Sequence, residues 1–268
     1  MLEIVLSHLS SATDKQAKIH ILRELLQTIV LYRLSNSPHA ADLIFGGGTA
    51  LRFFYDLPRY SEDLDFEYDA IRNPQISLGT LMQPIARFFS DQGITTEHTG
   101  HEKTTVYKGY FKFPGLLHQL GLSTDPKRTF TIKLEIDTHP PALTSTETFT
   151  ISKYNFTFPL RKRDLPGMMA GKLAALIKRP YTKGRDYYDT MWYMLHRVTP
   201  DMELLEEMTG ISTLDGLLER MDTIFDRYDP SVIIQDVGPF LQRQAEIENL
   251  KQLKDIQKQY RQTITLGI

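Results

Sequence analysis

The sequence contains no cysteine among its 268 residues and only one tryptophan. The absence of cysteine excludes disulfide staples, thiolate zinc sites, iron–sulfur clusters and thiol nucleophiles. No run approaches the ~18 apolar residues that a membrane-spanning helix needs. The N-terminus also lacks the basic-then-apolar order of a secretory signal. We therefore expect no membrane partner and a cytoplasmic location.

An excess of charge of either sign is also missing. The chain has 31 Lys and Arg against 33 Asp and Glu, a formal net charge of −2, so its summed field offers no general attraction for nucleic acid. With 41% hydrophobic and 24% charged residues, the composition is that of an ordinary globular protein. Disordered and fibrous classes are excluded, and the length allows one large domain or two modest ones.

Hydrophobic periodicity predicts an α+β fold, with a mixed β-sheet in residues 1–160 and helices in residues 161–268. Early helices are predicted from Thr13 or Asp14 to Ser35, from Thr49 to Leu57, and over 77–93, where Pro84 marks a kink or an early end. Strands are predicted at Leu43–Phe45, Asp63–Tyr68, Thr104–Phe113, Thr129–Asp137 and Phe149–Phe158. Later helices are predicted from Asp164 to Pro180, from Arg185 to Arg197, and through most of the chain beyond Asp201.

The strongest local signal is Gly47-Gly48-Thr49, followed by Asp63 and Asp65. A glycine turn that enters a helix presents backbone N–H groups to an anion, and a Thr49 hydroxyl adds a donor, which suits phosphate. Carboxylates at i and i+2 of a strand lie about 6–7 Å apart and point the same way. They suit two divalent ions about 3.5–4 Å apart. The glycine turn alone is also typical of an ordinary loop, and the pair of acids alone is typical of a solvated strand face.

A third carboxylate is available on the segment Lys133–Asp137, where Lys133, Glu135 and Asp137 share one face of a predicted strand. If this strand neighbours the strand of Asp63 and Asp65, then Glu135 or Asp137 completes the metal cage and takes a proton from an attacking hydroxyl. The alternative is an edge strand that displays solvated charges.

Basic residues gather between residues 161 and 197, where nine Lys and Arg face three Asp, so this segment carries +6 and the rest of the chain −8. Lys172 and Arg179 point from one helix face and suit phosphate or an RNA backbone. Asp186 and Asp189, on the next helix, are placed to pair with Lys172 or Arg185. The alternative is a solvated, salt-bridged surface. One of the interleaved aromatic residues is a candidate for stacking on a base: Tyr181, Tyr187, Tyr188, Trp192 or Tyr193.

Other familiar sites are absent from the sequence. The glycine turn lacks the third glycine of a dinucleotide fingerprint and the Lys-Ser/Thr of a P-loop. His98 and His101 form the only close histidine pair, and their Thr/Gly-rich segment is predicted to be a loop with no third metal ligand nearby.

Read together, four segments resemble the AbiEii/AbiGii family of nucleotidyltransferase-like toxins, to which the MenT toxins are related: GGGTALRFFYDLPRYSEDLDF, TIKLEID, KLAALIKRP and KGRDYYD. The resemblance covers roughly residues 43–195. It implies a nucleotidyltransferase catalytic domain over residues 1–160 and a helical domain over 161–268 that completes the active site.

By the same resemblance, Gly47, Gly48 and Thr49 contact nucleotide phosphates, while Asp63 and Asp65 hold Mg²⁺. Glu135 is the first choice for the third metal ligand and Asp137 the second. Lys172, Arg179 and Arg185 are expected to bind phosphate, and Asp186 to support the site.

The leading hypothesis is a Mg²⁺-dependent nucleotidyltransferase, with two ions expected and Mn²⁺ as a substitute, that moves a nucleoside monophosphate from an NTP to an acceptor hydroxyl. The resemblance suggests RNA, specifically tRNA, as acceptor, and a toxin role in a toxin–antitoxin or abortive-infection system with a cognate antitoxin. The alternatives are a nucleotide- or RNA-binding protein without turnover, and a nucleotidyltransferase that modifies a protein hydroxyl.

Overall fold

The computed structural model describes every residue except 1, 13, 70–75, 142–144, 244 and 267–268. The chain divides into two compact units, which are described separately. The sheet unit comprises Met1–Tyr55, Ser61–Pro140 and Thr148–Lys162, and the helical unit comprises Asp56–Tyr60, Pro141–Glu147 and Arg163–Ile268. The sequence suggested one division, between residues 160 and 161, whereas here two short earlier segments group with the later helices.

One mixed sheet of seven strands lies within the described residues, in the order β3-β4-β5-β2-β1-β7-β6. The strands are β1 (Leu43–Gly46), β2 (Asp63–Tyr68), β3 (Glu97–His101), β4 (Val106–Pro114), β5 (Thr129–Asp137), β6 (Thr146–Lys153) and β7 (Phe156–Arg163). The β2–β5 and β1–β7 pairs are parallel, and the β1–β2, β3–β4 and β4–β5 pairs are antiparallel. The predicted α+β fold with a mixed sheet is confirmed.

In its described residues, the sheet unit contains five helices: α1 (Leu2–Leu9), α2 (Lys15–Ser35), α3 (Gly47–Tyr55), α4 (Leu78–Asp91) and α5 (Leu116–Gln119). Asp14 caps α2 as predicted, because its carboxylate accepts a hydrogen bond from the Ala17 N–H at 2.8 Å. Thr13, the alternative cap, lies outside the described residues. Pro84 lies inside α4, which continues to Asp91, so this helix does not end early at the proline.

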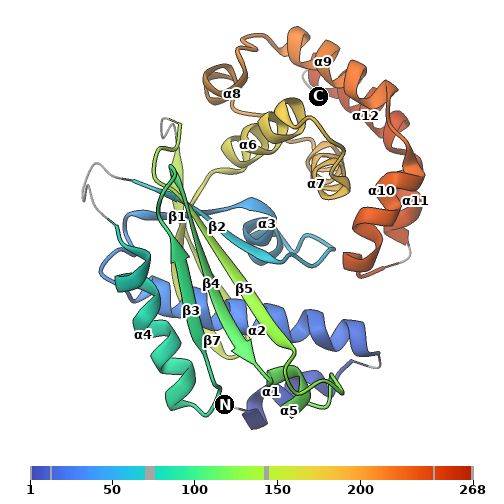
Figure 1. Cartoon of the computed structure of the whole chain (residues 1–268). Coiled ribbons are helices and arrows are strands. Elements are labelled where there is room, and N and C mark those ends of the chain that lie inside the picture. Colours follow the sequence, from blue (N-terminus) through green and yellow to red (C-terminus); the bar gives the residue numbers. More distant parts are fainter. Residues whose placement is uncertain (1, 13, 70–75, 142–144, 244, 267–268) are drawn as a thin grey trace. The chain divides into compact units, whose positions relative to one another are not determined.

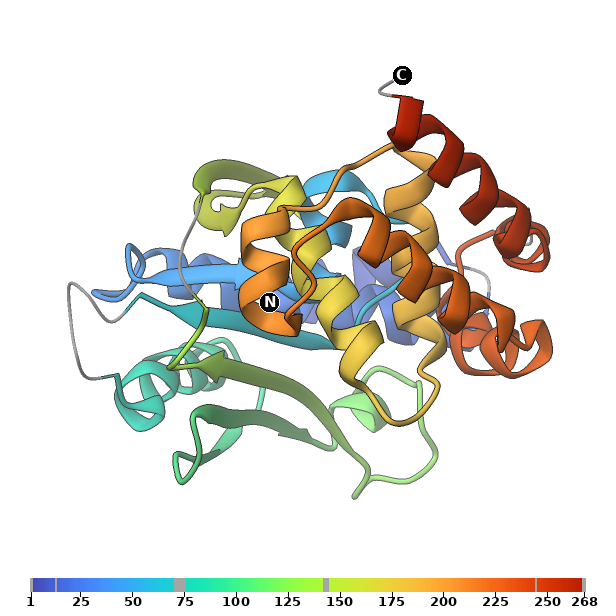
Figure 2. The same ribbon diagram turned by 90° about the horizontal axis from the view of Figure 1, so that it is seen from above.

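The sheet buries one face and leaves acids on the other. Leu64 and Phe66 of β2 and Leu134 of β5 are at most 3% exposed. Helices α2 and α4 cover this apolar face (Figure 1), and α4 packs beside β3 and β4 (Figure 2). Because side chains alternate along a strand, burial of these residues directs Asp63, Asp65 and Glu135 to the opposite face. Each large apolar side chain buried this way contributes about 1.5–3 kcal/mol.

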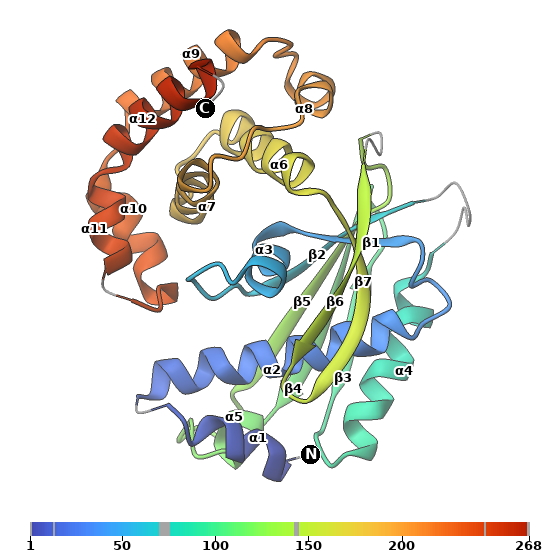
Figure 3. The ribbon, with the colours of Figure 1, turned by 180° about the vertical axis from the view of Figure 1, so that it is seen from behind.

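Two sequence predictions for this sheet are wrong. The single strand predicted at Phe149–Phe158 is a hairpin of β6 and β7 (Figure 3). Tyr154 and Asn155, with φ of 50° and 64°, form its turn, and positive φ at two successive residues is typical of a two-residue hairpin. The segment of His98 and His101, predicted as a loop, is strand β3, because β4 supplies hydrogen-bonding partners that compensate for its polar composition.

The helical unit contains α6 (Leu165–Lys178), α7 (Gly184–Leu195), α8 (Met202–Thr209), α9 (Leu214–Asp226), α10 (Pro230–Val237), the 3₁₀ helix η1 (Gly238–Phe240), α11 (Ala245–Lys251) and α12 (Leu253–Leu266). Asp164 caps α6 by accepting from the Gly167 N–H at 2.9 Å, with Pro166 in the first turn, as predicted. Helix α7 is buried along nearly its whole length and packs against α6, α10 and α12. In the part of the chain that the structure describes, no helix combines the length and apolarity needed to cross a membrane.

Candidate active site

The predicted glycine turn joins β1 to α3 and lies against Asp65. Gly46 pairs with Asp65 across the antiparallel β1–β2 ladder. Gly47 follows with a φ of +69°, and a Cβ at this position would overlap the Asp65 carboxylate. Only glycine satisfies both demands, because it has no Cβ and adopts positive φ without strain. The turn therefore places the N-terminal N–H groups of α3 beside a carboxylate of β2.

Thr49 fixes the turn to the start of β2. Its side chain is fully buried, and its hydroxyl donates a hydrogen bond to the main-chain carbonyl of Asp63. From the other side, Gln27 of α2 donates to the carbonyls of Ser61 and Glu62, at 3.2 and 2.9 Å. These contacts set where β2 begins and so orient Asp63. The expected contact of the Thr49 hydroxyl with phosphate stays a prediction.

Strands β2 and β5 are parallel neighbours, as the third-carboxylate hypothesis required. Their register pairs Asp63 with Lys133 and Asp65 with Glu135. Directly paired residues in a sheet point to the same face, so the three acids share it. The other candidate, Asp137, is two residue pairs further along, opposite Glu67, and its carboxylate accepts from the His139 N–H at 3.0 Å. The register therefore places Glu135 nearer to Asp63 and Asp65 than Asp137.

A lysine stands between two of these acids. Lys133 Nζ is 3.0 Å from Glu135 Oε2 and 4.0 Å from Asp63 Oδ2, and Lys108 Nζ lies 3.9 Å from Glu135 Oε1. Burial by itself lowers the pKa of Lys133, but the contacts with Glu135 and Asp63 outweigh it and raise the pKa above its ordinary value. The ammonium is thus held in its charged form, with a positive charge where the acids converge.

Asp63, Asp65 and Glu135 are the candidate ligands for a divalent ion. Within the described residues, no three Asp, Glu or His side chains are gathered tightly enough to hold a metal ion as they stand. The oxygens of Asp63, Asp65 and Glu135 nevertheless match the hard-ligand preference of Mg²⁺, and the Lys133 ammonium demonstrates that this position accommodates a cation. These residues fit a divalent ion provided that Lys133 withdraws.

In the helical unit, Lys172 of α6 is enclosed by two acids of α7. Its Nζ lies 3.0 Å from Asp186 Oδ1 and 2.8 Å from Asp189 Oδ2, and Arg179 also pairs with Asp186. The prediction that an acid of the second helix pairs with Lys172 is confirmed. Burial alone would lower the pKa of Lys172, but the Asp189 and Asp186 charges raise it, so the buried ammonium keeps its proton.

Arg59, which no pattern in the sequence singles out, completes this cluster. Its Nε and Nη2 donate to the two carboxylate oxygens of Asp189, at 2.6 and 2.7 Å, and Asp189 is fully buried. Arg59 is 3% exposed. A bidentate contact of this kind is the strongest form of carboxylate–arginine pairing. We refer to Arg59, Lys172, Arg179, Asp186 and Asp189 as the buried charge cluster.

Three further basic residues of the 161–197 segment have partners within their own units. Arg161 pairs with Asp69 at 2.9 Å and Lys162 donates to the Tyr55 hydroxyl at 2.7 Å, both within the sheet unit. Arg185, in the helical unit, stacks on Phe240, with its guanidinium 4.8 Å from the ring centroid. These contacts agree with the salt-bridged alternative at Arg161. The expected phosphate contacts of Arg185, Lys172 and Arg179 stay predictions.

Comparison with known proteins identifies the family to which this chain belongs. A family model described as the nucleotidyl transferase AbiEii toxin of type IV toxin–antitoxin systems matches residues 29–264. Because the match spans most of the chain, the protein belongs to this family of nucleotidyl transferases. Membership implies an NTP substrate and an antitoxin partner.

Solved structures support the fold. A Helicobacter pylori protein assigned as a nucleotidyltransferase matches with a TM-score of 0.59 and 21% identity, covering 92% of this chain and 96% of the other. JHP933 from Helicobacter pylori matches with a TM-score of 0.56 and 20% identity over the same shares. Among curated proteins, none matches this chain.

Proposed function

We propose that this nucleotidyl transferase is Mg²⁺-dependent and transfers a nucleoside monophosphate to a hydroxyl of RNA, with tRNA as the expected acceptor. The observation that carries the proposal is the parallel register of β2 and β5, which sets Glu135 beside Asp65 and next to Asp63 on the open face of the sheet. The glycine turn lies against Asp65, one of these acids, so N–H donors for phosphate and an oxygen ligand for a cation occur together.

The reaction forms a bond between the acceptor oxygen and the α-phosphorus of the NTP. The bond between the α-phosphorus and its bridging oxygen to the β-phosphorus breaks, and pyrophosphate leaves with that electron pair. We assign Glu135 to accept the proton of the acceptor hydroxyl, with Asp137 as the second choice. When bound to Asp63, Asp65 and Glu135, Mg²⁺ supplies positive charge that stabilises the negative charge on the transferred phosphoryl group.

Fixed cations and dipoles of the protein provide the remaining charge stabilisation. The first N–H groups of α3, which follow Gly47, are placed to bind phosphate oxygens. We propose that Lys172 and Arg179 of the helical unit bind NTP phosphates, with Asp186 holding both cations in position. A preorganised charge is effective in catalysis because it needs no rearrangement when the negative charge develops.

The test is transfer of label from each α-³²P-labelled NTP to total RNA and total protein. We expect labelled RNA with the wild type and Mg²⁺, and a loss of about 100-fold or more with Asp63→Asn. Label on protein in place of RNA would overturn the assigned acceptor and leave the chemistry intact.

A matched control lies on the same strand and face. Glu67→Gln, two residues beyond Asp65, changes the same amount of charge at a position that pairs with Asp137 and not with Glu135, so it should keep most of the activity. Circular dichroism on each variant separates loss of chemistry from loss of fold. Full transfer by Asp63→Asn would refute the proposed mechanism.

The toxin role predicts an antitoxin encoded beside this chain. Expression of the wild type alone should arrest growth, and Asp63→Asn should not. If cells that express an active wild-type enzyme grew normally, the toxin role would be refuted, but the proposed transfer reaction would not.

A further inference from the structure

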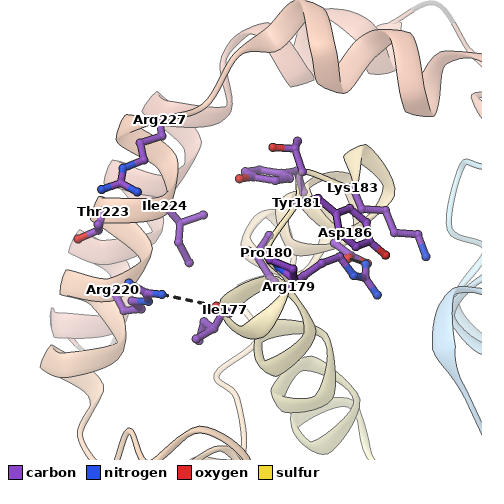
Figure 4. Close-up of a pocket in the computed structure, with 13 residues that line it drawn as sticks. Ile177, Arg179, Pro180, Tyr181, Lys183, Asp186, Arg220, Thr223, Ile224 and Arg227 are labelled. Carbon is purple, nitrogen blue, oxygen red and sulfur yellow. Dashed lines mark hydrogen bonds and ion pairs between the residues drawn. The ribbon is translucent and has the colours of Figure 1, made fainter. Parts of the chain in front are cut away.

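A pocket of about 250 Å³ lies within the helical unit, between α9 and the connection from α6 to α7 (Figure 4). Its lining is polar and rich in cations. The lining includes Arg179, Tyr181, Arg220, Thr223, Ile224 and Arg227. Apart from Arg179, none of these belongs to the site proposed above.

The α9 side of the pocket is a stripe of one helix face. Arg220, Thr223, Ile224 and Arg227 follow the i, i+3, i+4, i+7 spacing that aligns residues along a helix. The core-facing residues of α9, such as Met221 and Phe225, lie on another face and are buried. Core packing therefore does not account for the two arginines of the stripe.

The pocket carries a surplus of positive charge. Across the described residues, neither Arg220 nor Arg227 forms an ion pair, and the one side-chain hydrogen bond made by either is a 3.5 Å contact from Arg220 to the Ile177 carbonyl. The one acid in the lining, Asp186, already pairs with Lys172 and Arg179. An unneutralised pair of arginines on a concave surface attracts an anion, and a guanidinium fork matches phosphate oxygens.

An exposed aromatic ring stands at the same pocket. Tyr181 is 64% exposed, whereas the neighbouring aromatic residues Tyr187, Tyr188, Trp192 and Tyr193 are buried. The Arg179 guanidinium lies 5.4 Å from the Tyr181 ring centroid, which holds the ring against a cation. In Figure 4 the ring faces Ile224 across the open space. A flat ring beside cations, accessible from solvent, suits stacking by a nucleobase.

We propose that this pocket binds single-stranded RNA, with Arg220 and Arg227 on backbone phosphates and Tyr181 stacked on a base. The pocket is slightly smaller than the range of about 300–1,000 Å³ usual for small-molecule sites, which suits a phosphate with its sugar better than a whole NTP. For the role of the bound RNA as acceptor, the inference rests on the proposed function. Binding itself is independent of turnover.

The test measures binding of a short, fluorescein-labelled, single-stranded oligoribonucleotide to the full chain by fluorescence anisotropy at several salt concentrations. Arg220→Gln/Arg227→Gln should weaken binding about tenfold and reduce the slope of log K against log salt by about 1.4, because two phosphate contacts are lost. Tyr181→Ala should weaken binding about fivefold or more without changing the slope. The control Lys251→Gln/Lys258→Gln removes the same charge from exposed positions of α11 and α12 and should change neither.

Unchanged affinity in both pocket variants would overturn the inference, as would displacement of the RNA by ATP, which would assign the pocket to the nucleotide. Asp63→Asn keeps the pocket intact and should bind RNA normally while losing transfer. Normal RNA binding by the pocket variants would therefore refute this site alone, whereas full transfer by Asp63→Asn would refute the proposed mechanism alone.

Discussion

Asp65 and Glu135 lie directly opposite each other on the parallel strands β2 and β5, although 70 positions separate them in the sequence. The pairing brings together two acids that a metal site needs on one face. It also separates the two candidates for the third ligand, because Asp137 pairs with Glu67 instead. Because of this register, we expect substitution of Glu135 to reduce transfer activity more than substitution of Asp137.

Glu135→Gln should lower transfer by about 100-fold or more, whereas Asp137→Asn should lower it by less than about tenfold. Both changes remove one negative charge from the same strand and face, so they are matched in chemistry and differ in register. The measurement is initial-rate transfer from labelled NTP at saturating Mg²⁺. Equal losses in the two variants would contradict the assignment of Glu135.

Gly47→Ala tests the contact between the glycine turn and Asp65. Gly93 provides the control, because its φ of +79° resembles the +69° of Gly47 but no atom lies within 4 Å of its missing Cβ. Both alanine variants should lose about 1 kcal/mol or more of unfolding free energy from the strained backbone. Only Gly47→Ala should displace the Asp65 carboxylate and abolish transfer.

Urea unfolding and initial-rate transfer on the two variants give the comparison. Retention of full activity by a folded Gly47→Ala variant would show that the turn does not position Asp65 for catalysis.

Local sequence patterns predicted the strands in which buried and exposed residues alternate and the helices that begin at a capping residue. The strand of Asp63–Tyr68 and the strand of Thr129–Asp137 were predicted with their observed bounds, because burial of one face leaves a two-residue period. Strand β3 was missed because Glu97–His101 is exposed along most of its length and has no apolar face. The Tyr154-Asn155 turn was missed because it contains neither glycine nor proline, and Asn155 is its single turn-favouring residue beside a tyrosine that gives no turn signal.

Long-range charge pairing could be predicted only in part. Asp186 and Lys172 lie 14 residues apart on consecutive helices, and helix periodicity aims them at each other. Arg59 gives no such signal: it lies in a short loop, and its partner Asp189 is 130 residues away. The sequence also could not show that β2 and β5 are neighbours, because parallel pairing depends on how the intervening strands are arranged. The hypothesis of a third carboxylate had to assume this pairing.

Lys133→Gln should increase the affinity of the acids for a divalent ion. The Lys133 ammonium contacts Glu135 and Asp63 and competes with any cation bound there. Removing one unit charge about 4 Å away in a partly solvated site changes affinity by about five- to tenfold. Without metal, repulsion between the remaining acids should lower the melting temperature, and Mg²⁺ should restore it more in the variant than in the wild type.

Calorimetric titration with Mg²⁺ or Mn²⁺ and thermal melts at two Mg²⁺ concentrations check this expectation. Lys112→Gln is the control, because Lys112 lies on β4 opposite Thr131, away from the acids. Equal metal affinity in wild type and Lys133→Gln would show that Lys133 does not compete for the metal position.

The buried charge cluster predicts a large loss of stability when one acid is removed. Asp189→Asn leaves Arg59, which is 3% exposed, without a carboxylate partner and removes one of the two acids at Lys172. Breaking a buried ion pair from one side costs about 3–5 kcal/mol, because the remaining charge stays desolvated. The exposed pair of Asp255 and Lys258 provides the contrast, since Asp255→Asn should change stability little.

The same cluster sets a pH dependence. Burial alone would raise the pKa of Asp189, but Arg59 and Lys172 hold it below its ordinary value of 3.8. A lowered folded-state pKa stabilises the fold above the unfolded-state pKa, and this contribution is lost as pH falls through the folded-state value. The free-energy difference between wild type and Asp189→Asn should therefore be constant above about pH 5 and shrink below about pH 4. Urea unfolding monitored by circular dichroism from pH 7 to pH 3 measures it, and a difference that did not shrink in acid would mean that the Asp189 carboxylate is not the source of the stabilisation.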